Sequence, residues 1–272
     1  MAKLKIGIIG CGAIGSSLAK YISSDLTKKA QLIGLCDINR ESAFKLAVKV
    51  GNPKLVTPDL KVLIKKSDLI IEATKAAAAF EIAKKVLSEA KDIMVMSAGG
   101  MINRYKELSE LAEKKSSKIF IPSGAICGID GTKGLACAKI KKVTLTTTKP
   151  PEAFAGVAYI ADKNIKLDGI RDDLVIFEGS AEAAVSAFPQ NINVASTLSM
   201  AGIGAKETTV RIIASPKIKR NIHEVEIDSD AGKIIARTEN VIHPDNPKTS
   251  FLAVLSAIAV LKGILSPIKI GT

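Results

Sequence analysis

Residues 4–37 read LKIGIIGCGAIGSSLAKYISSDLTKKAQLIGLCD. The first six residues are apolar and rich in Ile, which is typical of a strand buried inside a parallel sheet. A glycine-rich loop follows at 10–15, residues 16–26 are expected to be helical, and residues 30–37 form a second apolar strand that ends in an acid. This order predicts a strand–helix–strand unit whose two strands are parallel.

The alternation of strands and helices continues to residue 124. Further strands are expected at 67–74, 91–99 and 117–124, and further helices at 40–50, 76–90 and 104–115. Repeated units of this kind favour an α/β fold with a doubly wound parallel sheet. We therefore predict a Rossmann domain over residues 1–124.

Beyond residue 124 the pattern changes to that of half-exposed strands, in which apolar and polar side chains alternate. Such strands are expected at 141–151, 208–215, 221–229 and 232–242, with a short strand and helical segments between 174 and 204. Mostly antiparallel strands with few helices predict a smaller α+β domain over 125–247. Residues 246–265 are expected to form an apolar helix, and we expect the segment 248–272 to return to the first domain.

The composition narrows the classes of partner. The 272 residues carry a net charge of +12, but the lysines are scattered and aromatic residues make up only 4%. A solvated lysine-rich surface is therefore favoured over a nucleic-acid interface. The longest apolar stretch, residues 251–261, is too short to span a bilayer, so no membrane partner is expected. The start of the chain has no signal-peptide pattern.

The four cysteines, at positions 11, 36, 127 and 137, have no C-x-x-C spacing. No metal site is predicted from them. So few cysteines in a chain of this length fit a reducing compartment, and we expect the protein in the cytoplasm.

The segment Gly10-Cys11-Gly12-Ala13-Ile14-Gly15 matches the G-x-G-x-x-G fingerprint of dinucleotide-binding folds, and it lies in the required place between strand and helix. Gly10 would permit the tight turn, Gly12 would let a pyrophosphate approach the backbone, and Gly15 would let the helix pack closely on the strand. The N–H groups at the start of the helix would bind the phosphates.

Asp37 lies 22 positions beyond Gly15, at the end of the second predicted strand. A carboxylate there accepts hydrogen bonds from the ribose hydroxyls of NAD. Arg40 follows closely and could pair with the additional phosphate of NADP. We predict that NAD is preferred and that NADP is possible, with Ile38 and Asn39 also in the cofactor site.

Three further loops follow predicted strands and should line the same crevice. They are EATK at 72–75, SAGG at 97–100 and PSGAICG at 122–128. Small residues such as Ala98 would let the nicotinamide half of the cofactor lie close to the backbone. In the segment FPQNINVAST, Asn191 or Asn193 could cap the next helix or face the nicotinamide, and the sequence does not distinguish these roles.

The chain has two histidines, and a histidine is the usual general acid or base near neutral pH. His223 begins an alternating strand; if Ile222 faces the core, His223 lies on the opposite face together with Asn221. A histidine that only packs in the sheet is the alternative. No role is assigned to His243.

The segment DNPKTS, residues 245–250, precedes the apolar helix. We expect Asn246 to cap this helix, with Lys248, Thr249 and Ser250 in its first turn. A lysine at the positive end of a helix dipole is locally unfavourable unless it serves an anion, so these three residues are predicted to bind a substrate carboxylate.

Taken together and in this order, the glycine loop, PSGAICGIDG, FPQNINVAST, NIHEVEI and DNPKTS resemble the L-aspartate dehydrogenase family over essentially the whole chain. The family is similar in architecture to dihydrodipicolinate reductase and homoserine dehydrogenase. The resemblance implies NAD(P)-dependent interconversion of L-aspartate with iminoaspartate, which hydrolyses to oxaloacetate and ammonia. It also implies that the imine feeds NAD biosynthesis.

The resemblance further implies site residues. His223 corresponds to the family's active-site histidine, and Ala125 and Asn193 correspond to its cofactor contacts. Lys248, Thr249, Ser250 and Asn221 are our candidates for holding the substrate carboxylates. A related reductase acting on dihydrodipicolinate, aspartate semialdehyde or homoserine is the nearest alternative, and a non-catalytic NAD-binding protein is a remote one. A homodimer or homo-oligomer is expected from the predicted exposed sheet face.

Overall fold

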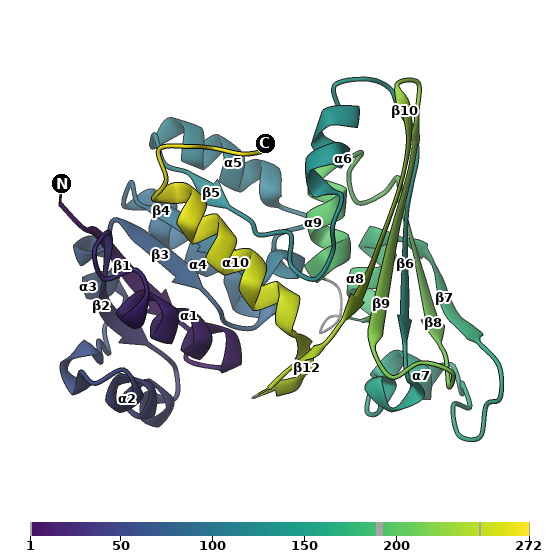
Figure 1. Ribbon diagram of the computed structural model, residues 1–272, viewed down its shortest axis with the longest axis horizontal. Helices are drawn as coiled ribbons and strands as arrows, with labels where there is room; N and C mark the ends of the chain where they lie inside the picture. Colours follow the sequence, from purple (N-terminus) through teal and green to yellow (C-terminus); the bar gives the residue numbers. More distant parts are fainter. Residues whose placement is uncertain (1, 189–192, 245, 272) are drawn as a thin grey trace. The chain divides into compact units, whose positions relative to one another are not determined.

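The computed structural model describes residues 2–188, 193–244 and 246–271, without the side chains of residues 247 and 248 (Figure 1). The chain forms two compact units. The first comprises Met1–Pro122 with Val254–Lys269, and the second comprises Ser123–Ala253 with Ile270–Thr272. The first boundary lies two residues before the predicted one, and the second unit extends six residues past 247.

The first unit contains a five-stranded parallel sheet in the order β2-β1-β3-β4-β5. Its strands are β1 (Leu4–Ile9), β2 (Ala30–Cys36), β3 (Leu69–Glu72), β4 (Asp92–Val95) and β5 (Ile119–Phe120). Its helices are α1 (Ala13–Ser24), α2 (Arg40–Lys49), α3 (Leu60–Lys66), α4 (Ala76–Ser88), α5 (Tyr105–Lys114) and α10 (Phe251–Ile264), with short 3-10 turns η1 (Pro53–Leu55) and η2 (Ala98–Gly100). The predicted doubly wound parallel sheet is confirmed.

Both faces of this sheet are buried, which explains the continuous apolar runs of its strands. Along β1, Ile8 packs with α1 and α10 on one face, while Ile9 packs with α3, α4 and α5 on the other. The connection after β1 leads to β2 on one side, and the connection after its other neighbour, β3, leads to β4 on the opposite side, so the strand order switches between β1 and β3. Ligands of such sheets bind at this switch point.

The C-terminal helix packs on the first sheet, as expected. Ala257 and Leu261 of α10 are fully buried in the same core cluster as Ile6 and Ile8 of β1. Figure 1 shows α10 in yellow beside α1 in purple. Within the described residues no helix is both long and apolar enough to cross a membrane, and α10 itself has 14 residues.

The predicted start of this helix is wrong. Asn246–Ser250 forms a strand, β12, which pairs with β11 (Ile242–His243). The hairpin is held locally, because Asn246 Nδ2 donates to Thr249 Oγ1 over 3.0 Å and the Phe251 N–H donates to the Val241 carbonyl over 2.8 Å. Side-chain bonds of this kind compete with helix formation, and α10 begins only at Phe251.

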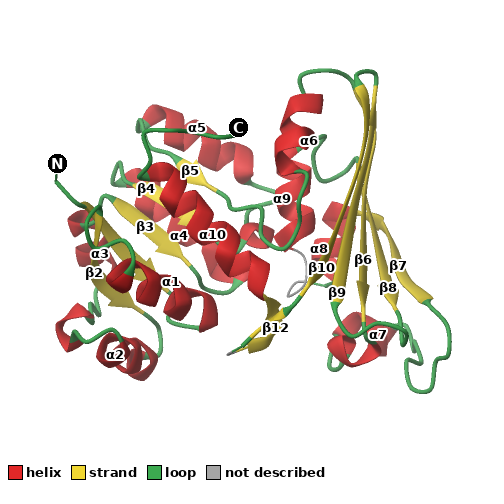
Figure 2. Cartoon of the chain, in the orientation of Figure 1, coloured by secondary structure: helices red, strands yellow, loops and turns green. Residues whose placement is uncertain are grey.

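The second unit contains a mixed five-stranded sheet in the order β10-β9-β6-β8-β7. Its strands are β6 (Ile140–Lys149), β7 (Leu174–Ser180), β8 (Thr208–Ala214), β9 (Asn221–Ser229) and β10 (Gly232–Asn240). Only β6 and β8 pair in parallel. Its helices are α6 (Ile129–Leu135), α7 (Ala158–Asp162), α8 (Ala181–Ala187) and α9 (Asn193–Ala201), with the turn η3 (Pro151–Phe154). Helices α6, α8 and α9 cover one face of the sheet (Figure 2).

Side chains alternate between the two faces of this sheet. Leu145, Thr147 and Lys149 of β6 are buried on the helix-covered face. The opposite face is more open, with Ile235 64% exposed and Val175 41% exposed. The two faces therefore offer different surfaces, one enclosed and one open.

Candidate active site

The glycine loop after β1 has the geometry that its sequence predicts. Gly10 has a φ of +96°, and a Cβ there would collide with the carbonyl of Ala73 after β3. A Cβ at Gly15 would collide with the carbonyl oxygen of Gly10. At Gly12, in contrast, a Cβ would meet no atom within 4 Å. The fold itself therefore requires glycine at positions 10 and 15 but not at position 12.

Helix α1 begins directly at this loop. Gly12 caps it without a side-chain hydrogen bond, and its first turn, which includes half-buried Ala13 and Ile14, contains no acidic residue. The N-terminal N–H groups and the positive end of the helix dipole suit an anion such as a pyrophosphate. The space in front of Gly12 fits that group.

Asp37, one residue beyond β2, is connected to the glycine loop. Its Oδ2 accepts a hydrogen bond from the Cys11 N–H over 2.6 Å, and its Oδ1 accepts one from the Asn39 N–H over 2.8 Å. Asn39 in turn caps α2, while Ile38 and Arg40 are exposed. The Asp37 carboxylate is thus fixed beside the loop, at the end of β2 where the fingerprint places its acid.

A buried carboxylate joins the loops that follow β3 and β4. Glu72 is fully buried, and its Oε1 accepts hydrogen bonds from the Thr74 N–H over 2.7 Å and the Thr74 hydroxyl over 2.6 Å. Its Oε2 accepts one from the Ser97 N–H over 3.1 Å. The Ser97 hydroxyl donates to the Thr74 carbonyl over 2.6 Å. This network holds buried Ala98 in the loop at the carboxyl edge of the sheet.

In the second unit, His223 lies on the helix-covered face of β9. It is 4% exposed and shares this face with Val225, whereas Ile222 points to the open face. The condition considered in the sequence analysis, that Ile222 faces the core, is therefore not met, and His223 is the residue that faces it. The alternation was read correctly, but Ile222 belongs to the open face, where apolar side chains are tolerated.

His223 is oriented by a neighbouring strand. Thr147 lies opposite it in the β6–β9 register, and Thr147 Oγ1 and His223 Nδ1 are hydrogen-bonded at 2.9 Å. Burial lowers the pKa of His223 to about 3, and the charge of Lys149 contributes in the same direction. The imidazole is therefore neutral at physiological pH, and its protonation depends on what binds beside it.

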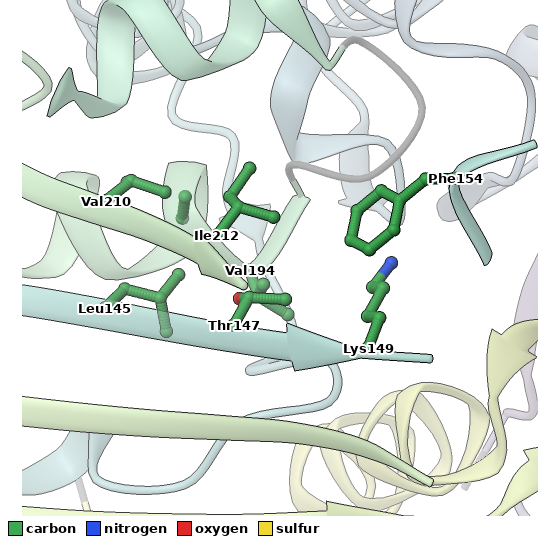
Figure 3. A pocket seen from close by; sticks show the side chains of 8 residues that line it. Leu145, Thr147, Lys149, Phe154, Val194, Val210 and Ile212 are labelled. Atoms are coloured by element: carbon green, nitrogen blue, oxygen red, sulfur yellow. The ribbon is translucent and has the colours of Figure 1, made fainter. Parts of the chain in front are cut away.

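A pocket in the second unit lies next to this pair of residues (Figure 3). It is lined by Leu145, Thr147, Lys149, Phe154, Val194, Ala195, Val210 and Ile212. Burial lowers the pKa of Lys149 to about 8. The pocket thus contains a threonine bonded to His223, a buried lysine and otherwise apolar side chains.

Ala125 is held by two side chains of β10. Its carbonyl oxygen accepts hydrogen bonds from Thr238 Oγ1 over 2.9 Å and from Asn240 Nδ2 over 3.0 Å. Thr238 lies opposite His223 in the β9–β10 register. The Ala125 peptide is therefore fixed to a strand next to the one that bears the histidine.

The remaining predicted site residues are more dispersed. Asn221 is the half-buried first residue of β9, and Asn193 is the first residue of α9. Thr249 and Ser250 lie in β12 rather than in a helix. The side chain of Lys248, and Asn191 as a whole, lie outside the described residues. His243 is buried with its ring 5.5 Å from that of Phe251 in an edge-to-face contact.

Comparisons with known proteins cover the whole chain. Residues 10–122 match the homoserine dehydrogenase NAD-binding domain, and residues 130–264 match the C-terminal domain of aspartate dehydrogenase. The L-aspartate dehydrogenase of Methanosarcina mazei is 44% identical over 99% of this chain and 100% of its own length, and that of Methanosarcina barkeri is 42% identical with the same coverage. The chain belongs to the L-aspartate dehydrogenase family.

A solved structure supports this placement in the L-aspartate dehydrogenase family. The aspartate dehydrogenase of Thermotoga maritima has a TM-score of 0.73 and 25% identity, covering 99% of this chain and 100% of its own. A hyperthermophilic archaeal homoserine dehydrogenase in complex with NADPH has a TM-score of 0.59 at 16% identity, covering 96% of this chain and 98% of its own. This second likeness shows the fold alone.

Three polar residues of the second unit were not singled out from the sequence. Two of them, Thr147 and Lys149, occupy inward positions of an alternating strand, and a lysine at such a position is the signal that could have found them. Glu72 of the first unit lies in the segment EATK, which the sequence analysis placed among the loops at the crevice. Asn240, in contrast, has no local signal, because its bond to Ala125 joins residues far apart in sequence.

Proposed function

We propose that this protein catalyses the NAD(P)-dependent oxidative deamination of L-aspartate to iminoaspartate, which hydrolyses to oxaloacetate and ammonia, and the reverse reductive amination. The observation that carries the proposal is a buried histidine, His223, oriented by Thr147 in a chain that matches L-aspartate dehydrogenases over its full length. In this role the enzyme supplies iminoaspartate for NAD biosynthesis.

NAD is the proposed cofactor, with NADP possible. The residues that would hold it are those of the glycine loop, the segment Asp37 to Arg40, Ala98, Ala125 and Asn193. When bound, the nicotinamide supplies the acceptor for the hydride that leaves the substrate. Asp37 already accepts two backbone N–H groups and is negatively charged, which supports NAD over NADP. Asp37→Ala should reduce the ratio of NAD to NADP activity, and an unchanged ratio would exclude this role.

His223 is proposed as the general base. The substrate amine must be neutral before its Cα–H bond breaks, so the enzyme has to accept a proton. If Nδ1–H donates to Thr147 Oγ1, then Nε2 carries the lone pair that accepts the proton. In the reverse direction the same nitrogen returns it. In that tautomer the Thr147 hydroxyl accepts the Nδ1–H and orients the ring, which leaves Nε2 to the substrate.

The substrate carboxylates require cationic or N–H partners. Asn221, Lys248, Thr249 and Ser250 remain our candidates for them, although the helix-terminus argument no longer applies to the last three because they lie in β12. Lys248→Ala should mainly raise the KM for L-aspartate. An unchanged KM would leave this lysine without a role in binding.

The test of the function is a substrate panel. NADH formation is followed with L-aspartate and NAD, beside L-glutamate, L-alanine and L-homoserine. Turnover with L-aspartate above the others supports the proposal. NADH oxidation with dihydrodipicolinate or aspartate semialdehyde, and no turnover of L-aspartate, would keep the fold and overturn the substrate.

We further propose a cytoplasmic homodimer or homo-oligomer without nucleic-acid or membrane partners. All four cysteines are free, which supports a reducing compartment. The open face of the second sheet, with exposed Val175 and Ile235, supports self-association. Light scattering tests this: Ile235→Lys should lower the assembly state, and a monomeric wild type at assay concentration would contradict it.

A further inference from the structure

Glu72 is the last residue of β3, and its fully buried carboxylate is bonded to two different loops. Its Oε1 accepts the N–H and the hydroxyl of Thr74 after β3, and its Oε2 accepts the N–H of Ser97 after β4. Burial of a carboxylate is costly, because the group loses its hydration. The residues paired with Glu72 on the neighbouring strands, Ile9 and Val95, are buried and apolar. The packing of the sheet alone therefore does not call for an acid here.

The two loops are also joined above this carboxylate. The Ser97 hydroxyl donates to the Thr74 carbonyl over 2.6 Å. A Cβ on Gly100 would collide with the carbonyl oxygen of Ala76, so the turn η2 lies directly against the start of α4. The two loops thus form one cross-linked substructure. We refer to residues 73–75 and 97–100 as the paired loops.

The paired loops lie at the edge of the sheet where ligands of this fold bind. They follow the carboxyl ends of β3 and β4, on the far side of the switch point from β2. The glycine loop and Asp37 lie on the near side, where the fingerprint places the pyrophosphate and the adenosine ribose. A dinucleotide that spans the crevice then presents its nicotinamide half to the paired loops.

We propose that Glu72 is a positioning residue for the nicotinamide half of NAD. It acts through the paired loops, whose backbone it holds in one conformation before the cofactor arrives. A surface that is ordered in advance binds more tightly, because less conformational entropy is lost on binding. This inference deepens the cofactor site proposed above and rests on it for the half of NAD that the loops face.

The experiment compares the Kd of Glu72→Gln for NAD with its Kd for ADP-ribose, which lacks the nicotinamide. An amide has one accepting oxygen, and its NH2 cannot accept an N–H. We expect the oxygen to stay with the two donors of Thr74, so the NH2 faces the Ser97 N–H and the loop after β4 is released. The Kd for NAD should rise about 10-fold, which corresponds to one lost hydrogen bond to a charged group. The Kd for ADP-ribose should equal that of the wild type.

Asp92→Asn is the matched control. Asp92 begins β4 at the opposite edge of the same sheet, and its Oδ1 accepts the Lys118 N–H over 2.8 Å. The same change from acid to amide there should leave both Kd values unchanged. A wild-type Kd for NAD in Glu72→Gln would overturn the proposal. An equal rise for NAD and ADP-ribose would also overturn it, because general damage to the domain affects both ligands.

Ser97→Ala tests the paired loops without changing the buried charge. It removes the hydroxyl bond to Thr74 and keeps the Glu72 carboxylate. The Kd for NAD should again rise while the Kd for ADP-ribose stays constant. If Glu72→Gln does not fold, Ser97→Ala decides, and a wild-type Kd for NAD in this variant overturns the proposal.

Failure of the proposed function would look different, because these experiments measure binding and not turnover. If the wild type did not oxidise L-aspartate but Glu72→Gln weakened NAD alone, the function would fail and the inference would stand. If the wild type oxidised L-aspartate while Glu72→Gln bound NAD normally, the function would stand and the inference would fall.

Discussion

His223, the proposed general base, is buried and has one side-chain hydrogen bond to Thr147. His223→Ala should lower kcat by about 10²- to 10⁴-fold, the usual contribution of a general acid or base. The Kd for NAD should not change, because His223 is not among the residues proposed to hold the cofactor, and its ring is bonded to Thr147. His243→Ala is the control, since that histidine packs against Phe251 and should affect stability rather than kcat. A His223→Ala enzyme with wild-type kcat would remove this residue from the mechanism.

The pH profile should reflect the low pKa of His223. With a pKa of about 3 in the free enzyme, the base is already deprotonated at neutral pH, so kcat/KM should show no inflection near 6.5 from this group. Bound substrate carboxylates favour the imidazolium form, so the acid limb of kcat should lie at higher pH than that of kcat/KM. An inflection of kcat/KM near 6.5 that disappears in His223→Gln would contradict this account.

At the scale of elements, the glycines of the loop between β1 and α1 have different predicted roles. Gly10 and Gly15 are needed for the fold, whereas Gly12 is expected to matter for cofactor binding. Gly10→Ala should destabilise the protein, because position 10 has a positive φ and because the new Cβ would collide with the carbonyl of Ala73. Gly12→Ala should leave the free energy of unfolding nearly unchanged, because its Cβ meets open space, yet it should raise the Kd for NAD. Thermal unfolding and NAD titration of both variants check this. Equal loss of stability in both would refute the distinction.

The first sheet could be predicted well because its strands carry their own signal. The strand expected at 4–9 is Leu4–Ile9 of β1, and the helix expected from 40 begins at Arg40. Helix α6 escaped prediction because it contains two glycines within seven residues, which is unusual in a helix. The start of α10 was predicted too early, at residue 246. Asn, Pro, Thr and Ser are common both in tight hairpins and at the start of helices, so the segment 246–250 fits either structure.

The site could be predicted only in part for a related reason. The glycine loop and Asp37 belong to one strand–helix–strand unit whose two strands are neighbours, so the local pattern predicts that they meet. His223 could be named as a candidate from the sequence, but its hydrogen-bond partner Thr147 is 76 residues away, and their contact depends on the strand order of a mixed sheet. Neither alternation nor spacing specifies which strands become neighbours.

At the scale of the whole molecule, Lys149 should make stability depend on pH. Its pKa falls from 10.5 in the unfolded chain to about 8 in the fold, so between these values the folded state binds fewer protons and stability rises with pH. The shift corresponds to about 3 kcal/mol. Lys149→Met should therefore be more stable than wild type below pH 8, with a difference that shrinks toward pH 10.5. Denaturant unfolding on both sides of pH 8 measures this difference, with Lys142→Met, at an exposed lysine of the same strand, as the control variant.

The packing of α10 on the first sheet has a consequence for synthesis. Leu261 is fully buried in the same core as Ile6 and Ile8, although more than two hundred residues separate them. A ribosome has exposed all five strands of that sheet long before it translates α10. Most domains fold in the order in which they are synthesised, the N-terminal one first. The first unit cannot complete its core in this way, because its last helix is made at the end of the chain. The intervening second unit can finish folding first, and the emerging nascent chain keeps an uncovered apolar surface that chaperones can bind until its last helix arrives.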